Sequence, residues 1–337
     1  MSEAGQISFE WRRWIAENLM LGVDAQAMLD ILVSNGIEAI AAARELQTAS
    51  AHPYVHAGNQ LVQLSKKIES LLQIRRELGG LLSGQQAIER RTMVSGEEFL
   101  RDYYAANRPV VLTDAITNWR ALSAWTPEYF KEQFGGVEIE VTADRSLDQN
   151  YERNVERHRR RMTFSDYVDR VLAPGESNDI YMVANNHTFE RLALCPLLND
   201  IELPHELLDA DAVAHSTFLW FGPAGTVTPL HHDPLNVLLA QVRGRKRVRM
   251  FPPAETPRLY NYVGVFSEVD CEKPDLRRFP LYGDALSMEL VLEPGEALFI
   301  PVGWWHHVRA LDLAISVSFT NFRFPNHYTW SDPNIRR

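Results

Sequence analysis

Two histidines and an aspartate have the residue types and the spacing of a metal site. His231 and Asp233 lie two positions apart in segment 228–234, and side chains two apart on an extended strand point to the same side. A third ligand is offered by His306 or His307, which follow a tryptophan pair. Two imidazoles and one carboxylate form the set that selects non-haem Fe(II) for oxygen chemistry. Without further support, His231 and Asp233 would be read as a surface hydrogen-bonded pair.

A lysine on an apolar strand face supplies part of that support. In the run 242–251, alternation places Lys246, Val248 and Met250 on one face and arginines on the other. An ammonium group on a buried face is costly unless it meets an anion. The carboxylate of 2-oxoglutarate remote from the iron is such an anion. The alternative is that Lys246 bends outward at a sheet edge.

Several motifs, in this order along the chain, resemble those of the JmjC, cupin-like oxygenases. They are WFGPAGT at 220–226, TPLHHDP at 228–234, GRK at 244–246, PGEALFIP at 294–301 and WWHH at 304–307. With the lead-in NRPVVL at 107–112 and Trp119, the resemblance covers residues 90–325. The pattern is similar to the branch of small protein hydroxylases that contains an arginyl and an asparaginyl hydroxylase.

The resemblance implies a mainly β fold, a double-stranded β-helix of the cupin or jelly-roll type whose mouth holds the metal. It implies that His231, Asp233 and His306, the first histidine of the pair, bind Fe(II). Strand alternation alone does not choose His306 over His307.

The resemblance also implies how the co-substrate is bound. Thr228 and Lys246 match family positions that bind the 2-oxoglutarate carboxylate, and Tyr181 resembles the tyrosine that joins them. Relatives often carry an asparagine six residues after the first iron-binding histidine. Here Val237 holds that position and Asn236 precedes it, so Asn236 would reach the co-substrate only through a bulge.

Further polar residues are candidates for substrate or co-substrate contacts. Ser318 stands where the asparaginyl hydroxylase has an asparagine on its last barrel strand. Asn185 and Asn186 lie where relatives place amides that contact the substrate.

Together these features predict a dioxygenase that uses Fe(II), 2-oxoglutarate and O2 to hydroxylate an amino-acid side chain in a protein or peptide. One alternative is a JmjC-type N-methyl demethylase, in which the same chemistry is followed by loss of formaldehyde. Another is a tRNA-base hydroxylase. The third is a cupin that binds ligands without catalysis.

The elements that position these residues fall into two regions. Apolar residues recur at three and four positions through 9–82, which predicts short helices with turns near Gly22 and Gly36. Beyond the glycines at 79–80 and 84, short β-branched runs alternate with Pro, Gly and Asp. The sequence therefore predicts an N-terminal helical region at 1–84, which dimerises or recruits substrate, and an oxygenase domain at 85–337.

One stretch of the helical region has the spacing of a coiled coil. Leu61, Leu64, Ile68, Leu71 and Leu78 follow a 3-4 repeat that is broken only by Arg75. This narrow seam predicts contact with a second copy of the chain. Packing against the chain's own domain is the alternative.

Bulk composition narrows the compartment and the partners. The N-terminus mixes charges with apolar residues, so a signal peptide and a membrane span are not expected. The two cysteines have no metal-ligand spacing, which favours a reduced, cytoplasmic protein. The net charge of −10 disfavours nucleic acid as a partner, and the basic run at 153–162 is interpreted as a solvated loop or helix face.

Overall fold

The structure is a computed structural model that describes residues 7–81, 87–183, 188–211, 213–261 and 264–330. It divides into two units, Met1–Leu78 and Gly79–Arg337. The division lies between Leu78 and Gly79, six residues before the boundary after residue 84 that the sequence predicts. Among the described residues, no helix combines the length and the hydrophobicity that a membrane span requires.

The first unit is helical. Its helices are α1 (Phe9–Leu21), α2 (Ala25–Ser34), α3 (Ala39–Ser50) and α4 (Pro53–Gly80). Gly22 ends α1 in the left-handed conformation, and Asp24 caps α2 by accepting a hydrogen bond from the amide of Ala27. Helices α1 to α3 form a small core of Ile15, Met28, Leu32, Ala42 and Leu46. By contrast, no residue of α4 is buried.

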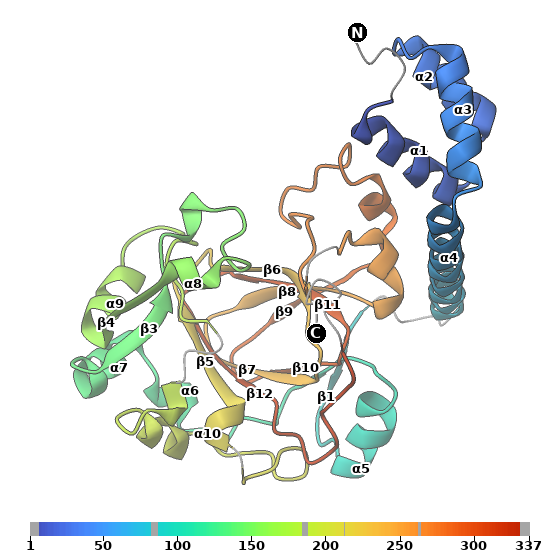
Figure 1. Ribbon diagram of the computed structural model, residues 1–337. Helices are drawn as coiled ribbons and strands as arrows, with labels where there is room; N and C mark the ends of the chain where they lie inside the picture. The colour runs from blue at the N-terminus through green and yellow to red at the C-terminus, as the bar shows by residue number, and fades with distance from the viewer. Residues whose placement is uncertain (1–6, 82–86, 184–187, 212, 262–263, 331–337) are drawn as a thin grey trace. The chain divides into compact units, whose positions relative to one another are not determined.

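The second unit is mainly β, as expected, and two of its sheets face each other (Figure 1). The larger sheet has the order β1-β2-β10-β7-β12-β5, and the smaller one has the order β6-β11-β8-β9. All their pairs are antiparallel except β1 with β2. The strands are β1 (Glu89–Arg91), β2 (Val110–Leu112), β5 (Thr217–Gly222), β6 (Val227–His232), β7 (Val237–Arg243), β8 (Lys246–Phe251), β9 (Met288–Leu292), β10 (Ala297–Ile300), β11 (Trp305–Ala310) and β12 (Ala314–Phe319). This is the cupin-like barrel that the sequence predicts.

Alternation along the strands separates two apolar layers. Between the sheets, Leu239 and Leu298 of the larger sheet join a cluster with Val248, Met250 and Leu292 of the smaller one. The opposite face of the larger sheet belongs to a second cluster that takes in residues of the short helices. These helices are α5 (Gly96–Phe99), α6 (Ala121–Ala124), α7 (Pro127–Phe134) and α9 (Phe164–Val171). Two more short helices, α8 (Val155–His158) and α10 (Val213–Ser216), contribute no residue to this cluster. The larger sheet is therefore buried on both faces, which makes it a rigid base for a site between the sheets.

The arginine-rich run at 153–162 has more regular structure than a solvated loop. It forms α8 and then β4 (Arg159–Thr163), which pairs with β3 (Glu138–Thr142). Arg159 and Arg160 form ion pairs with Glu140 and Asp144. Carboxylates therefore occupy these two guanidinium groups, which are not free to bind a phosphate backbone.

Candidate metal centre and co-substrate pocket

Strands β6 and β11 bring His231, Asp233 and His306 together. His231 and His306 are direct partners across the strand pair, and their ring centroids lie 4.1 Å apart. Asp233 follows the last residue of β6, and its Oδ2 lies 3.6 Å from Nε2 of His306. One ligand atom from each of the three residues lies within 4.8 Å of the others. This spacing suits a single metal ion.

The donor atoms of the two histidines are oriented for a metal. Nδ1 of His231 donates to the carbonyl of Pro229 at 2.8 Å, and Nδ1 of His306 donates to the carbonyl of Trp304 at 3.0 Å. In each ring Nε2 is therefore the nitrogen left to face a metal. Burial lowers the pKa of His306 to about 3, so its imidazole is neutral, as a metal ligand must be. Two imidazoles and a carboxylate fit Fe(II).

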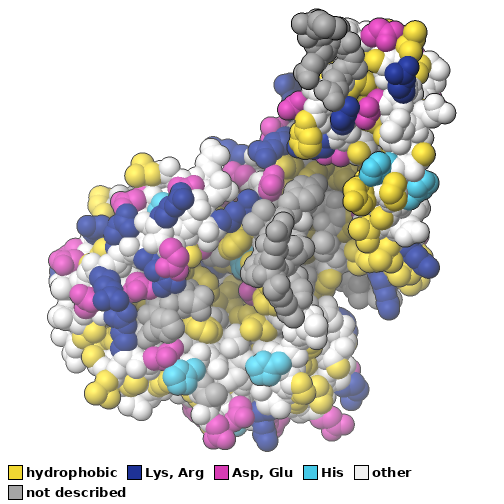
Figure 2. Space-filling view, viewed as in Figure 1, with side chains coloured by type: hydrophobic (Ala, Val, Ile, Leu, Met, Phe, Trp, Pro, Cys, Tyr) yellow, Lys and Arg dark blue, Asp and Glu magenta, His cyan; other side chains and the backbone are white. Residues whose placement is uncertain are grey.

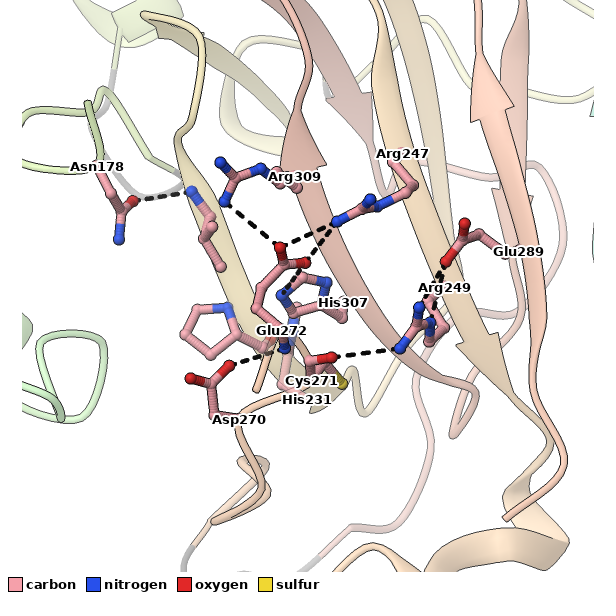
Figure 3. A network of polar contacts seen from close by, with 12 residues as sticks. Asn178, His231, Arg247, Arg249, Asp270, Cys271, Glu272, Glu289, His307 and Arg309 are labelled. Carbon is pink, nitrogen blue, oxygen red and sulfur yellow. Dashed lines mark hydrogen bonds and ion pairs between the residues drawn. The ribbon is translucent and has the colours of Figure 1, made fainter. Parts of the chain in front are cut away.

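The neighbouring histidine belongs to a different environment. His307 points to the outer face of the smaller sheet, where its Nε2 lies 3.7 Å from Glu272 (Figure 3). Glu272 also pairs with Arg247 and Arg309. Burial lowers the pKa of His307 to about 4. The structure thus makes the distinction between His306 and His307 that alternation alone could not make.

A cavity of about 470 Å³ extends from the metal site to Lys246 at the start of β8. Burial alternates along β8 as predicted, with Lys246, Val248 and Met250 buried. The ammonium group hydrogen-bonds the hydroxyl of Tyr181 at 3.2 Å and forms no ion pair among the described residues. Burial lowers the pKa of Lys246 to about 7. A buried cation without an anionic partner, at the end of a cavity, fits the remote carboxylate of 2-oxoglutarate.

Tyr181 and Thr228 complete this end of the cavity. Both residues line the cavity, and burial raises the pKa of Tyr181, whose hydroxyl therefore keeps its proton. Gly222 makes room for the ring, because a Cβ there would lie 2.6 Å from Cδ2 of Tyr181. Ser318 also lines the cavity and accepts a hydrogen bond from Nε1 of Trp220 at 2.8 Å.

Asn236 is placed elsewhere. It is fully buried and is not among the residues that line the cavity. Its Nδ2 donates to the side chains of Asn326 and Tyr328, and its Oδ1 accepts from the amide of Val302 at 2.8 Å. No bulge turns Asn236 towards the co-substrate. Its hydrogen bonds instead hold the segment after β12, which contains Asn326 and Tyr328, in place. Asn185 and Asn186 lie outside the described residues.

Replacement of Asn236 by alanine is therefore expected to affect stability and not co-substrate binding. The change leaves the buried amide of Val302 and the carboxamide of Asn326 with fewer partners, at a cost of about 2–3 kcal/mol in unfolding free energy. Urea denaturation would measure the loss, and titration with 2-oxoglutarate would give an unchanged Kd. A Kd raised tenfold in the folded variant would return Asn236 to the co-substrate site.

Three residues of this region carried no recognisable sequence signal. Glu152 and Phe266 line the cavity, and Phe266 lies 5.7 Å from His231 between ring centroids. Arg145 is buried behind Tyr181, with its guanidinium 5.2 Å from that ring and 2.8 Å from Glu152. These residues come from segments with no motif, so only the fold brings them to the site.

The low pKa of Lys246 predicts a pH-dependent affinity for the co-substrate. The ammonium form is required to bind a carboxylate, so binding takes up a proton once the pH exceeds about 7. The Kd of 2-oxoglutarate should therefore rise with pH, approaching about tenfold per pH unit. Anaerobic titrations between about pH 6.5 and 8.5 would measure this. A flat profile would contradict the assignment of Lys246.

Comparison with known proteins agrees with this geometry. A family model described as a cupin-like domain matches residues 96–326. The chain belongs to the JmjC, cupin-like family. The residues that line the pocket, including the metal centre, run from Glu152 to Thr320, so the family match includes all of them.

Named relatives differ in the reaction that their names give. The chain is 37% identical over 245 residues to lysine-specific demethylase 8 of Xenopus tropicalis, covering 71% of this chain and 54% of that protein. It is 35% identical over 239 residues to lysine-specific demethylase JMJ30 of Arabidopsis thaliana, covering 69% and 54%. It is 28% identical over 250 residues to the human bifunctional peptidase and (3S)-lysyl hydroxylase JMJD7, covering 66% and 79%. The chain thus spans about half the length of the first two relatives.

Proposed function

We propose that this protein is an Fe(II)- and 2-oxoglutarate-dependent dioxygenase that hydroxylates an amino-acid side chain in a protein or peptide. The observation that supports this most strongly is that one cavity joins the His231, Asp233 and His306 cluster to the buried ammonium of Lys246. A binding module without catalysis would have no need for both a three-ligand metal centre and a site for a dicarboxylate.

In this proposal each residue has a defined task. His231, Asp233 and His306 hold the metal, and Lys246, Thr228 and Tyr181 bind the remote carboxylate of 2-oxoglutarate. When bound, Fe(II) with 2-oxoglutarate and O2 supplies the oxidising power for insertion of oxygen into a C–H bond. Ser318 and Trp220 form part of the wall that keeps the co-substrate in one orientation.

An acidic residue in the wall of the cavity favours a basic side chain as the target. Glu152 lines the cavity, and its Oε1 pairs with the buried Arg145. That pairing holds the carboxylate in place, and its second oxygen would accept a hydrogen bond from an ammonium or guanidinium group. The relatives named as acting on lysine support the same class of target.

N-methyl demethylation is the second candidate, because two of the named relatives are called lysine-specific demethylases. The two reactions use the same site and differ in the carbon that is hydroxylated. A hydroxyl on an N-methyl carbon is lost with that carbon as formaldehyde, whereas a hydroxyl on the side chain stays. The basic run, paired with carboxylates, gives no comparable support to a tRNA substrate.

The test is a peptide library that contains lysine, arginine and N-methyl-lysine, supplied with Fe(II), 2-oxoglutarate and O2. The proposal expects succinate formation together with a peptide that gains the mass of one oxygen atom. Formaldehyde and a peptide that has lost a methyl group would establish demethylation instead. If the protein binds metal and 2-oxoglutarate but turns over no class of peptide, the result would favour the binding module.

We also place the protein in the cytoplasm, since both cysteines are free.

A further inference from the structure

Helix α4 presents an apolar stripe that nothing in its own unit covers. The stripe consists of every residue at alternating steps of three and four from Tyr54 to Leu78, and all eight are exposed: Tyr54, Ala57, Leu61, Leu64, Ile68, Leu71, Arg75 and Leu78. Its six large apolar side chains are between 52% and 79% exposed. In Figure 2 hydrophobic side chains gather along this helix. The core of α1 to α3 includes no residue of α4.

Two positions of the stripe lack a large apolar side chain, and in one arrangement of two helices they would face each other. Arg75 is the single charged residue and Ala57 the single small one. In an antiparallel pair of α4 helices aligned about their midpoint, Ala57 faces Arg75 of the second copy. The same alignment sets Tyr54 against Leu78, Leu61 against Leu71 and Leu64 against Ile68. The long side chain of Arg75 then meets the position with the most space, from which it can reach solvent.

We propose that α4 forms an antiparallel, two-stranded coiled coil with α4 of a second copy of this chain. A parallel pair in register would place Arg75 against Arg75 and Ala57 against Ala57, which combines like-charge repulsion with a packing gap. Antiparallel pairing removes both defects at once. It also sets the dipoles of the two helices in opposite directions.

The area is sufficient for a dimer. Six large apolar side chains that each lose roughly 100 Å² give about 600 Å² per chain, or about 1,200 Å² in all. That value is at the lower end of the range for specific, stable interfaces. A 28-residue helix spans about 42 Å, so the seam is long enough for the four layers of each half.

The first measurement is the mass of the full chain in solution by light scattering. The proposal expects twice the 38.5 kDa of one chain. Leu64→Glu, at the centre of the seam, should give the mass of a single chain, whereas Gln63→Glu on another face of α4 should leave the dimer intact. Because Leu64 and Gln63 are both exposed, neither change should unfold the chain, and circular dichroism checks this. A single-chain mass for the unchanged protein would overturn the proposal.

The second measurement tests the direction of pairing. Ala57→Glu should preserve or strengthen the antiparallel dimer, because it sets a carboxylate against Arg75 of the partner. Ala57→Arg, its opposite-charge control, should dissociate that dimer, because it sets a second guanidinium against Arg75. In a parallel pair both variants would weaken the dimer, since like charges would face each other at position 57 while Arg75 still faces Arg75. A dimer that Ala57→Glu weakens as much as Ala57→Arg does would overturn the antiparallel assignment.

Cross-linking gives an independent result on the same point. In a Cys195→Ser background, Leu61→Cys with Leu71→Cys should yield disulfides between position 61 of one chain and position 71 of the other. These positions are about 15 Å apart within one helix, too far for a disulfide in the same chain. Disulfides that join 61 to 61 and 71 to 71 would show the parallel pair and overturn the proposal.

Discussion

Replacing Asp233 with alanine is expected to abolish substrate-dependent succinate formation, with a loss of about three orders of magnitude or more. Asp233 supplies the carboxylate of the cluster with His231 and His306, and its side chain is 30% exposed. The fold should therefore tolerate the change. Two histidines alone would hold Fe(II) weakly. An Fe(II) complex of 2-oxoglutarate has a weak visible band from metal-to-ligand charge transfer, and this band should also vanish in the variant.

His307→Gln is the matched control for this variant. His307 lies on the same strand as His306 but faces the outer surface of the sheet, towards Glu272. The absorbance band should therefore persist in His307→Gln, even if its stability falls. If the Asp233→Ala protein kept the band and His307→Gln lost it, the metal centre would have to be reassigned.

Lys246→Met is expected to change two quantities in opposite directions. The variant keeps the length of the side chain and removes a buried ammonium whose described partner is the hydroxyl of Tyr181. Without co-substrate, the free energy of unfolding should rise by about 1–4 kcal/mol, because a buried charge is replaced by an apolar group. The Kd of 2-oxoglutarate should rise by about 100-fold or more, since its carboxylate loses its cation.

Chemical denaturation and anaerobic titration of the same preparation would measure both effects. Met at this position packs among Val248 and Met250, so gross misfolding is not expected. A variant that is less stable and binds 2-oxoglutarate normally would show that Lys246 has a structural role. Thr228→Val is a useful comparison, because it removes a hydroxyl from the same pocket without removing charge, and its effect on Kd should be smaller.

The sequence predicts those parts of the site that depend on local alternation. Period-two spacing places His231 and Asp233 together, and it places Lys246 on the buried face of β8, because a strand allows no other arrangement. By the same rule, Asn236 should face away from the side on which Val237 lies, the position where relatives have an asparagine. In the structure Asn236 is buried and bonded to Asn326, away from the cavity.

What the sequence does not predict depends on contacts between distant segments. Glu152 and Arg145 reach the cavity from a segment without a motif, and their ion pair with each other is visible only in three dimensions. Likewise, β4 was not expected, because a run of charged residues is usually interpreted as a solvated loop or helix face. In the structure β4 pairs with β3, and two of its arginines form ion pairs with Glu140 of β3 and with Asp144, which follows β3. These contacts stabilise the strand.

The position of β6 in its sheet would give a bound metal ion a mechanical role. β6 is the edge strand of the smaller sheet, and its one strand neighbour there is β11. Because His231 and His306 are direct partners across these two strands, a bound ion would bridge them as a cross-strand clamp. Removal of the ion by a chelator should then destabilise the edge strand β6 before the larger sheet. The amides of β6 should exchange with deuterium faster than those of β7. Metal occupancy would in this way set the local rigidity of the surface that receives the substrate.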